Sequence, residues 1–451
     1  MRLERERSDG RRDFWEAKVS KTSLETTTGI VNVRNKKTSK HFSSPKDAKA
    51  ALQKAEAAKR KAGFTEPVVI GAQFLPTPMP TNGALEDAIR EAKHEAGPCS
   101  VYADWLQSQD SPAGELVALA AALETKQDAK KQKRFDELAR QLALPTPDFA
   151  TWGFRHGFWQ WLRLENGKDW MDDKFDPLAF ATKLFATPLC AALDELRIGI
   201  LRWDHNSHDV PAVLEAAGDC RWSKALARLH LGDVDGNIDM AHHVIGDVGQ
   251  TITKAFPALR SLKLHSGSQE WRGVGETFGL AGLALPKLES LTIETCAMTK
   301  ARLDAVLGAK LPALTQLELW FGGSDRDAGA QAADLAPLLD GKVFSKVTHL
   351  GLRNLDFMGD LIEQLVASKI APRLVHLDLS MGTLDDDWVA HLGANADRFR
   401  SLKVLDVDDN FLRPRDLREL RSSFTKAQVL SKKQDKLEDA EDDDRFVSVH
   451  E

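Results

Sequence analysis

Histidines are the residues of this chain whose spacing could hold a metal ion. They gather in two places, at His205 and His208 and at His242 and His243. A zinc site needs three or four ligands at one point, and neither pair has a third ligand at a convincing spacing. Histidines in solvated loops are the simpler interpretation, so the sequence predicts no metal site and no cofactor.

Acidic clusters offer a second chemistry, because carboxylates can hold a cation. The two clusters lie at 385–387 and 406–409. Aspartates in such positions more often form turns and cap helices. The sequence also lacks a Walker-type phosphate loop, a G-x-S-x-G motif and an H-E-x-x-H motif. We therefore expect a binding protein that is not an enzyme.

A hexad, Leu-x-x-Leu-x-Leu, dominates the chain from residue 159 onward. Nine copies begin at residues 159, 193, 226, 259, 288, 314, 347, 374 and 402, so the steps between them are 34, 33, 33, 29, 26, 33, 27 and 28 residues. The fourth and sixth positions alternate with polar ones, which is the period of a short strand with one buried face. Between the hexads, apolar residues three and four apart predict helices, as in 299–309.

A strand and a helix of this size cannot bury their apolar faces alone, so neighbouring units must stack. The array resembles the leucine-rich repeat family, of the type whose convex side is helical. The resemblance implies an α/β fold, a horseshoe-shaped solenoid of short parallel strands with convex helices, over residues 146–425. Its aromatic first part, 149–164, is expected to form the N-terminal cap. Asparagine rarely follows the hexads here, although Asn354 and Asn410 lie in nearby turns.

The third and fifth hexad positions, and the residue after the sixth, are expected to project from the concave sheet. These residues are Arg228, His230, Lys263, His265, Glu294, Glu318, Trp320, Arg353, His376, Asp378, Asp406 and Asp408. Basic residues and histidines dominate the early repeats and acidic residues the late ones, which predicts a charge gradient along the groove. Trp320 is the leading candidate for a contact, because tryptophan is enriched at interface hot spots. Alternatively, it lies against Phe321 and binds nothing. The sequence thus predicts a protein partner on this surface.

Residues 14–66 contain strand-like runs from Phe14 and at 29–33, then a lysine-rich turn at 34–37. Ser44 and Pro45 begin a helix that ends near Ala62. This stretch resembles a WGR domain, a small module of poly(ADP-ribose) polymerases and many bacterial proteins, although only Gly29 of the Trp-Gly-Arg signature is kept. The resemblance implies contacts between basic residues and DNA or RNA. The candidates are Lys18, Lys21, Arg34, Lys36, Lys37 and Lys40.

Charge is distributed unevenly between the two ends of the chain. Residues 1–66 contain 17 Lys and Arg against 9 Asp and Glu, or +8, so the total of −6 leaves −14 for the remainder. A basic head on an acidic body suggests that the two ends meet different partners. Phosphate binding by the head is one interpretation, and a solvated lysine-rich surface is the other.

The remaining segments are assigned from composition and motifs. Alternating prolines in 67–84 indicate an extended linker. In 85–145, the pentad Tyr-Ala-Asp-Trp-Leu at 102–106 and the later Gly-Glu-Leu at 114–116 resemble the repeat-companion domain, a helical module of planctomycete and myxobacterial proteins. Its aromatic residues are expected to form a helix core. The charged head 1–13 and the acidic tail 426–451 are expected to be disordered.

Cellular location follows from what the sequence lacks. It contains no apolar run long enough to span a bilayer and no apolar signal-peptide core at its N-terminus. Its four cysteines are scattered without a C-x-x-C pair, which is typical of free thiols in a reducing compartment. We expect a cytoplasmic protein without membrane contact, and the sequence does not define its oligomeric state.

Overall fold

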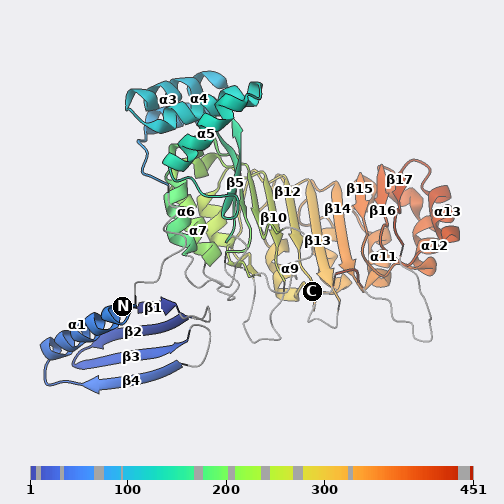
Figure 1. The fold of residues 1–451 in the computed structure, drawn as a ribbon. Coiled ribbons are helices and arrows are strands. Elements are labelled where there is room, and N and C mark those ends of the chain that lie inside the picture. The colour runs from blue at the N-terminus through green and yellow to red at the C-terminus, as the bar shows by residue number, and fades with distance from the viewer. Residues whose placement is uncertain are drawn as a thin grey trace. The chain divides into compact units, whose positions relative to one another are not determined.

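A computed structural model describes residues 2–6, 12–30, 35–64, 76–92, 95–166, 176–201, 209–234, 244–267, 278–323, 329–434 and 447–449. The chain forms two compact units, Met1–Gln73 and Phe74–Glu451 (Figure 1). The boundary between the units falls within the segment 67–84 that was expected to be a linker. The histidine pairs at 205–208 and 242–243 lie outside the described residues.

The first unit is a four-stranded antiparallel sheet in the order β1-β2-β3-β4, packed against one helix. Its elements are β1 (Arg2–Glu6), β2 (Arg12–Ser20), β3 (Ser23–Ile30), β4 (Asn35–His41) and α1 (Pro45–Lys61). Buried Trp15, Ala17 and Leu24 contact the helix residues Ala51 and Leu52. The expected helix start is confirmed, because the Ser44 hydroxyl accepts a hydrogen bond from the Asp47 amide at 3.2 Å.

Two expectations for this unit are wrong and a third is confirmed in part. Part of the supposedly disordered head forms β1, because its Leu3 is fully buried opposite Trp15 on β2. The extended run expected at 29–33 is confirmed in part: Gly29 and Ile30 end β3, which begins earlier, at Ser23, and includes the β-branched run Thr26–Thr28, while 31–33 lie outside the described residues. Lys36 and Lys37 lie within β4 and pair with β3, so they are not in a turn.

The second unit is built on an eleven-stranded sheet in the order β17-β16-β15-β14-β13-β12-β10-β8-β7-β6-β5. All neighbouring strands are parallel except β5 and β6. The strands are β5 (Ala150–Arg155), β6 (Phe158–Leu164), β7 (Glu195–Ile198), β8 (Arg228–Leu231), β10 (Ser261–His265), β12 (Ser290–Glu294), β13 (Gln316–Gly322), β14 (His349–Leu355), β15 (His376–Asp378), β16 (Val404–Asp406) and β17 (Gln428–Leu430). Two short strands, β9 (Gly246–Asp247) and β11 (Phe278–Gly279), pair separately. The expected α/β class is therefore confirmed, and each of the nine hexads contributes a strand to the large sheet.

Leucine register explains why the strands pair in this way. Leu262 of β10 lies opposite Leu229 of β8 and Leu291 of β12, and all three are buried. Burial alternates along β10 and β12 as the hexad predicts. One apolar cluster runs without interruption from Ile89 to Phe424. Each fully buried leucine contributes about 1.5–3 kcal/mol, so a one-residue slip in register would be costly.

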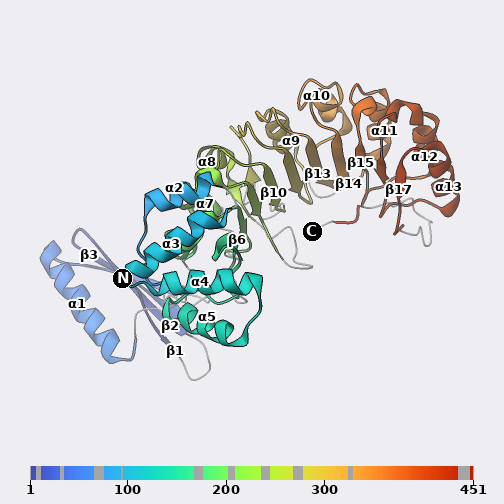
Figure 2. The same ribbon diagram turned by 90° about the horizontal axis from the view of Figure 1, so that it is seen from above.

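Helices lie along one face of this sheet, which is the outer side of its curve (Figure 2). They are α6 (Pro177–Phe185), α7 (Asp209–Gly218), α8 (Gly249–Ala255), α9 (Lys300–Leu307), α10 (Ala336–Leu339), α11 (Met358–Ala367), α12 (Asp386–Ala394) and α13 (Pro414–Ser423). Among the described residues no helix covers the inner face of the sheet from β8 to β16, and we call this the bare face. The described segment 447–449 lies at the strand ends beside this face, where the Ser448 amide donates to the Met381 carbonyl at 3.3 Å.

Four helices precede the sheet and form what we call the helical module. They are α2 (Gly83–Glu91), α3 (Ala96–Ser108), α4 (Pro112–Thr125) and α5 (Ala129–Gln141). Tyr102 is fully buried and its ring stacks on Phe158 of β6 at 5.5 Å, so the aromatic pentad packs in a core as expected. Part of the expected linker also packs here, since the Thr77 amide donates to the Leu142 carbonyl at 2.9 Å. Residues 76–82 of the expected linker form neither helix nor strand and belong to the second unit.

The C-terminal segment is also more ordered than expected. β17 lies within the supposedly disordered tail 426–451 and extends the sheet by pairing Val429 with Leu405. Val447 is buried, and the Val449 backbone makes two hydrogen bonds with the Asn354 amide, at 2.8 and 2.9 Å. The acidic residues between them fall outside the described ranges. No helix in the described parts of the chain is long and apolar enough to cross a membrane.

Candidate functional site

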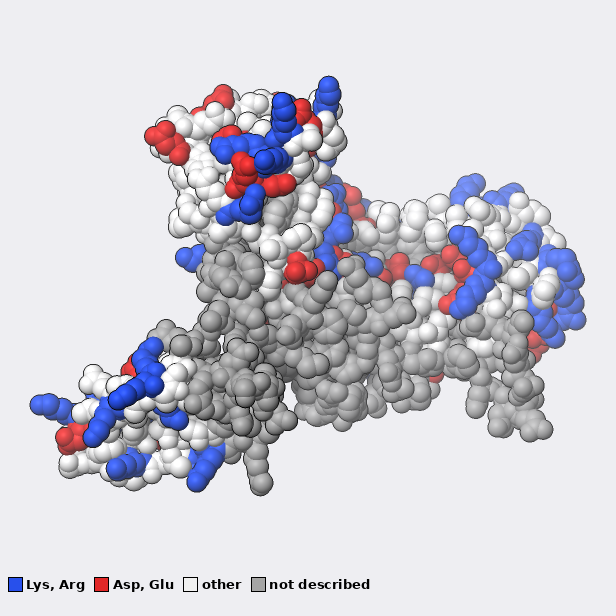
Figure 3. Space-filling view, viewed as in Figure 1, with Lys and Arg blue, Asp and Glu red and all other residues white. Residues whose placement is uncertain are grey.

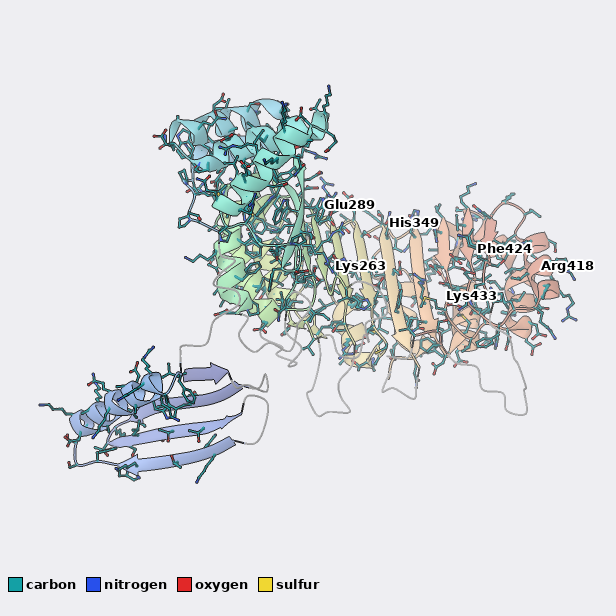
Figure 4. The ribbon with its side chains drawn as sticks, in the orientation of Figure 1. Lys263, Glu289, His349, Arg418, Phe424 and Lys433 are labelled. Carbon is teal, nitrogen blue, oxygen red and sulfur yellow. The ribbon has the colours of Figure 1, made fainter. Side chains whose placement is uncertain are left out.

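Parallel register brings the predicted surface residues together on the bare face. One row, set by the third hexad position, contains Glu195, Arg228, Ser261, Ser290, Gln316, His349 and His376. A second row, set by the fifth position, contains Arg163, Arg197, His230, Lys263, Thr292, Glu318, Gly351, Asp378 and Asp406. In two further pairs, His265 lies beside Glu294 and Trp320 beside Arg353. Lys263 is seen on this face in Figure 4.

Four of these side chains form what we call the Arg353 cluster: Glu318, Trp320, Arg353 and Asp378. The Arg353 Nη1 donates to Glu318 at 2.8 Å, and its Nε lies 3.4 Å from an Asp378 oxygen. The Trp320 indole also donates to Glu318 at 2.8 Å. The Arg353 guanidinium carbon lies 4.9 Å from the centre of the Trp320 ring. Cation–π and ion-pair contacts therefore fix these side chains before any partner arrives.

Electrostatics at the cluster follow from burial and from neighbouring charge. Burial alone would lower the pKa of Arg353, but Asp378 and Glu318 outweigh it and raise that pKa. Burial raises the pKa of Asp406, and the carboxylates of Asp378 and Asp408 add to the increase. The late end of the bare face thus places three carboxylates, those of Glu318, Asp378 and Asp406, near the Arg353 guanidinium.

Trp320 is half-buried rather than freely exposed. The alternative that it lies against Phe321 is not what the structure shows, because Phe321 is fully buried and its ring contacts Phe357 at 5.3 Å. Adjacent residues of a strand point to opposite faces, which separates the two rings. Trp320 therefore lies on the opposite side of β13 from Phe321, beside Arg353.

A hollow of about 170 Å³ lies in the middle of the bare face, beside the cluster. It exists because Gly351 occupies the fifth hexad position of its strand and has no side chain. Glu318 and Asp378 lie on either side of this glycine in the row, with His349 and His376 beside them. The two imidazole rings are 6.0 Å apart, and burial, with His376 nearby, lowers the pKa of His349.

At the early end of the sheet, from β6 to β12, cationic side chains alternate with carboxylates. The Arg163 Nε lies 3.0 Å from an Asp233 oxygen, and the His230 Nδ1 lies 3.4 Å from the other oxygen. Lys263 and His265 both contact Glu294, at 2.7 and 2.9 Å.

The pKa values of two groups at this end, His230 and Glu294, are shifted from their ordinary values. Burial lowers the pKa of His230 to about 4, against the opposing charge of Asp233, and Lys263 lowers it further. Burial would raise the pKa of Glu294, but hydrogen bonds from His265 and Lys263 prevail and lower it. His230 is therefore neutral at pH 7, and Glu294 is ionised.

The predicted charge gradient is consequently modified by pairing. Arg163, Arg197, Arg228 and Lys263 each lie within 4.0 Å of a carboxylate. The early end is thus close to charge balance, while the late end remains acidic. A gradient persists, but it runs from balanced to negative rather than from positive to negative.

Several residues of the bare face and of the two strands before it, β6 and β7, were missed by sequence reasoning. Arg163 and Arg197 occupy the fifth position of the first two hexads, and His349 and Gly351 occupy the third and fifth positions of the seventh. Applying the same positional rule to every copy would have found all four. Asp233 lies beyond its hexad, and no pattern in the sequence points to it.

The basic residues proposed for nucleic acid are not gathered on one face of the first unit. Lys18 lies opposite Glu25 of β3, and Lys37 lies opposite Thr27 of β3. Because Glu25 and Thr27 are two residues apart, Lys18 and Lys37 lie on one face of the sheet, and Lys36 and Lys40 lie on the other face. Lys21 lies in the turn between β2 and β3. Arg34 is outside the described residues. The three β4 lysines are exposed on an edge strand, where lysine also protects against edge-to-edge aggregation.

Within the described ranges no three His, Cys, Asp or Glu side chains are grouped so that they could hold a metal ion. The acidic clusters take part in other contacts. Asp385 caps α12 by accepting from the Trp388 amide at 3.2 Å, and Asp409 contacts Lys433 at 2.5 Å.

Comparison with known proteins gives one kind of information, the fold. No protein-family model matches the sequence, and no curated protein matches it. Among solved structures, the chain is similar to the crystal structure of a Bacteroides fragilis protein. The TM-score is 0.51 at 17% sequence identity, over 95% of this chain and 97% of that chain. At this identity the likeness shows a shared fold and carries no function.

Proposed function

We propose that the second unit is a leucine-rich repeat solenoid that binds a protein partner on its bare face, without catalysis. The observation that carries this proposal is the Arg353 cluster beside the Gly351 hollow. It combines an aromatic ring, a guanidinium and two carboxylates whose positions are already fixed by mutual contacts. Tryptophan and arginine are the side chains most enriched at interface hot spots, and prior fixation lowers the entropy lost on binding.

The charge of the late end suggests the chemistry of the partner. Three carboxylates near one guanidinium favour a partner segment that presents lysine or arginine. The hollow at Gly351 lies between Glu318 and Asp378 and is large enough for part of one such side chain. The balanced early end would then contribute complementary polar contacts.

Affinity purification from the native host tests this function. We expect the wild-type chain to retain a defined protein, and the double variant Trp320→Ala, Arg353→Ala to lose it. Arg418→Ala is the matched control, since Arg418 is exposed on α13 (Figure 4). Equal retention by the double variant and the control would remove the bare face from consideration.

The alternative proposal is a nucleic-acid adaptor whose first unit contacts phosphates. It is supported by three exposed lysines within β4, Lys36, Lys37 and Lys40, together with Lys18. Binding of the full chain to DNA or RNA should then weaken linearly with the logarithm of salt concentration. A full chain that binds neither at low salt would exclude this alternative. So would a Lys36→Glu, Lys37→Glu variant with unchanged affinity.

A further inference from the structure

A pocket of about 430 Å³ lies away from the Arg353 cluster, where the helical module meets the edge at which the strands begin. Ile89 and Arg90 of α2 and Cys99 of α3 form one side. Arg228 at the start of β8 and Arg260 just before β10 form another. A volume of this size is typical of small-molecule sites. The pocket shares Arg228 alone with the predicted protein-binding residues.

The lining of this pocket is strongly basic. Its cations are Arg90, Arg155, Lys224, Arg228, Arg260 and Lys287, and its carboxylates are Glu95 and Asp194, which leaves 6 − 2 = +4. Residues 74–451 as a whole carry −14, because the chain carries −6 and residues 1–73 carry +8. Lys and Arg side chains are visible where the module meets the sheet (Figure 3). A local excess opposite in sign to the whole unit favours binding of an anion.

Some of these charges lack a carboxylate partner among the described residues. Lys224 donates to two backbone carbonyls, those of Lys254 at 3.0 Å and Ala255 at 3.3 Å, which do not neutralise it. Lys287 is exposed at the rim, and no ion pair of the described chain involves it. These ammonium groups can therefore bind an anion without giving up an ion pair.

The arginines of the lining are partly neutralised. Arg228 pairs with Asp194 at 2.9 Å, and Arg260 pairs with Glu289, which lies at the same edge of the sheet (Figure 4). Arg90 contacts Asp87, yet its Nη1 is buried with no hydrogen-bond acceptor in the described part of the chain. Burial lowers the pKa of Arg90, in spite of Glu86, and the neighbouring Arg221 lowers it further. A negative charge in the pocket would stabilise this guanidinium through space.

The rest of the lining is apolar. Ile89, Cys99, Ala191, Leu193 and Ala225 contribute to it. Burial raises the pKa of the Cys99 thiol to about 11, so this side chain is neutral at pH 7 and packs as an apolar group. A suitable ligand therefore joins negative charge to an apolar or planar body.

We propose that this pocket binds a small organic phosphate, a molecule that carries one or more phosphate groups on an apolar or planar body. Guanidinium groups match phosphate oxygens in pairs, and ammonium groups add point charges, so several cations favour a multivalent anion. A nucleic-acid strand would need a charged stripe along its backbone. Here the cations come from three sides of one compact space. The proposal does not depend on the protein-binding function.

Titration calorimetry on the full chain tests it, with inorganic pyrophosphate and ADP as probes. We expect saturable binding of both, with ADP tighter because of its planar body. In Lys287→Glu the affinity should fall about tenfold or more, since a charge is reversed at the rim. Lys342→Glu is the control, because Lys342 is 70% exposed, pairs with Asp340 and does not line the pocket. Circular dichroism verifies each fold, and Arg260→Gln replaces Lys287→Glu if that variant misfolds.

Three results would overturn the proposal. The first is the absence of saturable binding for both probes at millimolar concentration. The second is an equal affinity of the Lys287→Glu and Lys342→Glu variants for ADP. The third is a single-stranded oligonucleotide that binds more tightly than ADP and gains affinity with its length, because that behaviour indicates an extended nucleic-acid surface.

Discussion

The guanidinium carbon of Arg353 lies 4.9 Å from the centre of the Trp320 ring, and both side chains donate to the same Glu318 oxygen at 2.8 Å. Because β13 and β14 are parallel and in register, the two residues are direct neighbours across the strands. Each one restricts the other. A partner that contacts this pair would meet side chains whose rotamer freedom is already reduced.

We expect Arg353→Ala to lower the free energy of unfolding by about 1–3 kcal/mol, because three nearby carboxylates lose their shared cation. Urea denaturation measures the change. Arg418→Ala, which removes an exposed arginine from α13, should alter stability by less than about 0.5 kcal/mol. A loss in Arg353→Ala no larger than in this control would show that the cluster contributes no stability.

We expect Gly351→Leu to abolish retention of the protein partner while the chain remains folded. A Cβ at residue 351 would lie 3.0 Å from the Glu318 Cγ, so a larger side chain fills the hollow and displaces that carboxylate. The matched control is Gly97→Leu, because a Cβ at Gly97 meets nothing within 4 Å. Retention should be measured by affinity purification of both variants. Undiminished retention in Gly351→Leu would mean that the hollow is not occupied by the partner.

Stability should depend on pH through His230. Its folded pKa of about 4 is below the ordinary value, so the unfolded chain takes up more protons between about pH 4 and pH 6.5. Stability contributed by the neutral imidazole is therefore present above pH 6.5 and decreases as the pH falls toward 4. In His230→Gln the slope of unfolding free energy against pH should be shallower by up to about 1.4 kcal/mol per pH unit.

Denaturation curves at several pH values measure that slope. His391→Gln, on α12 and outside the bare face, is the control and should leave the slope of the wild type unchanged. Identical slopes for the wild type and His230→Gln would contradict the burial of a neutral His230.

Replacing the buried Asn410 should lower the free energy of unfolding more than replacing most other polar residues at the sheet edge. Its buried amide donates to the carbonyls of Leu379, Val407 and Asp408 at 3.0–3.2 Å and accepts from the Leu384 amide at 3.0 Å. Asn410→Ala leaves these backbone groups unpaired, and we expect a loss of about 2–4 kcal/mol in unfolding free energy.

The comparison variant is Asn395→Ala. Asn395 makes a single side-chain hydrogen bond within the described chain, to the His391 carbonyl at 2.9 Å, so its loss should cost about 1 kcal/mol. Chemical denaturation ranks the two variants. The reverse order would mean that the Asn410 network adds little to stability.

Leucine spacing was sufficient to predict the strands, because the hexad specifies both a period and a buried face. All nine copies form strands, and the helix expected at 299–309 is α9, with Thr299 as its N-cap. β1 and β17 were missed because neither contains a hexad. Leu3 and Val429 are buried or partly buried through pairing with a neighbouring strand, which local sequence cannot show.

Positions on the bare face were predictable where the hexad rule applies, but their contacts were not. Glu294 joins Lys263 and His265, and Asp233 joins His230 and Arg163, only because adjacent strands lie in register. The basic pocket is harder still to predict from the sequence. Arg90, Arg155 and Lys287 come from three distant segments, and no spacing in the sequence links them.

The central claim is that a protein partner sits on the bare face, and site-specific photo-crosslinking in the native host tests it most directly. A photoreactive residue at Thr292, which lines the hollow, should form an adduct with one protein. The same residue at Arg418 on α13 should form none. An adduct at Arg418 with the same protein, and none at Thr292, would contradict the claim.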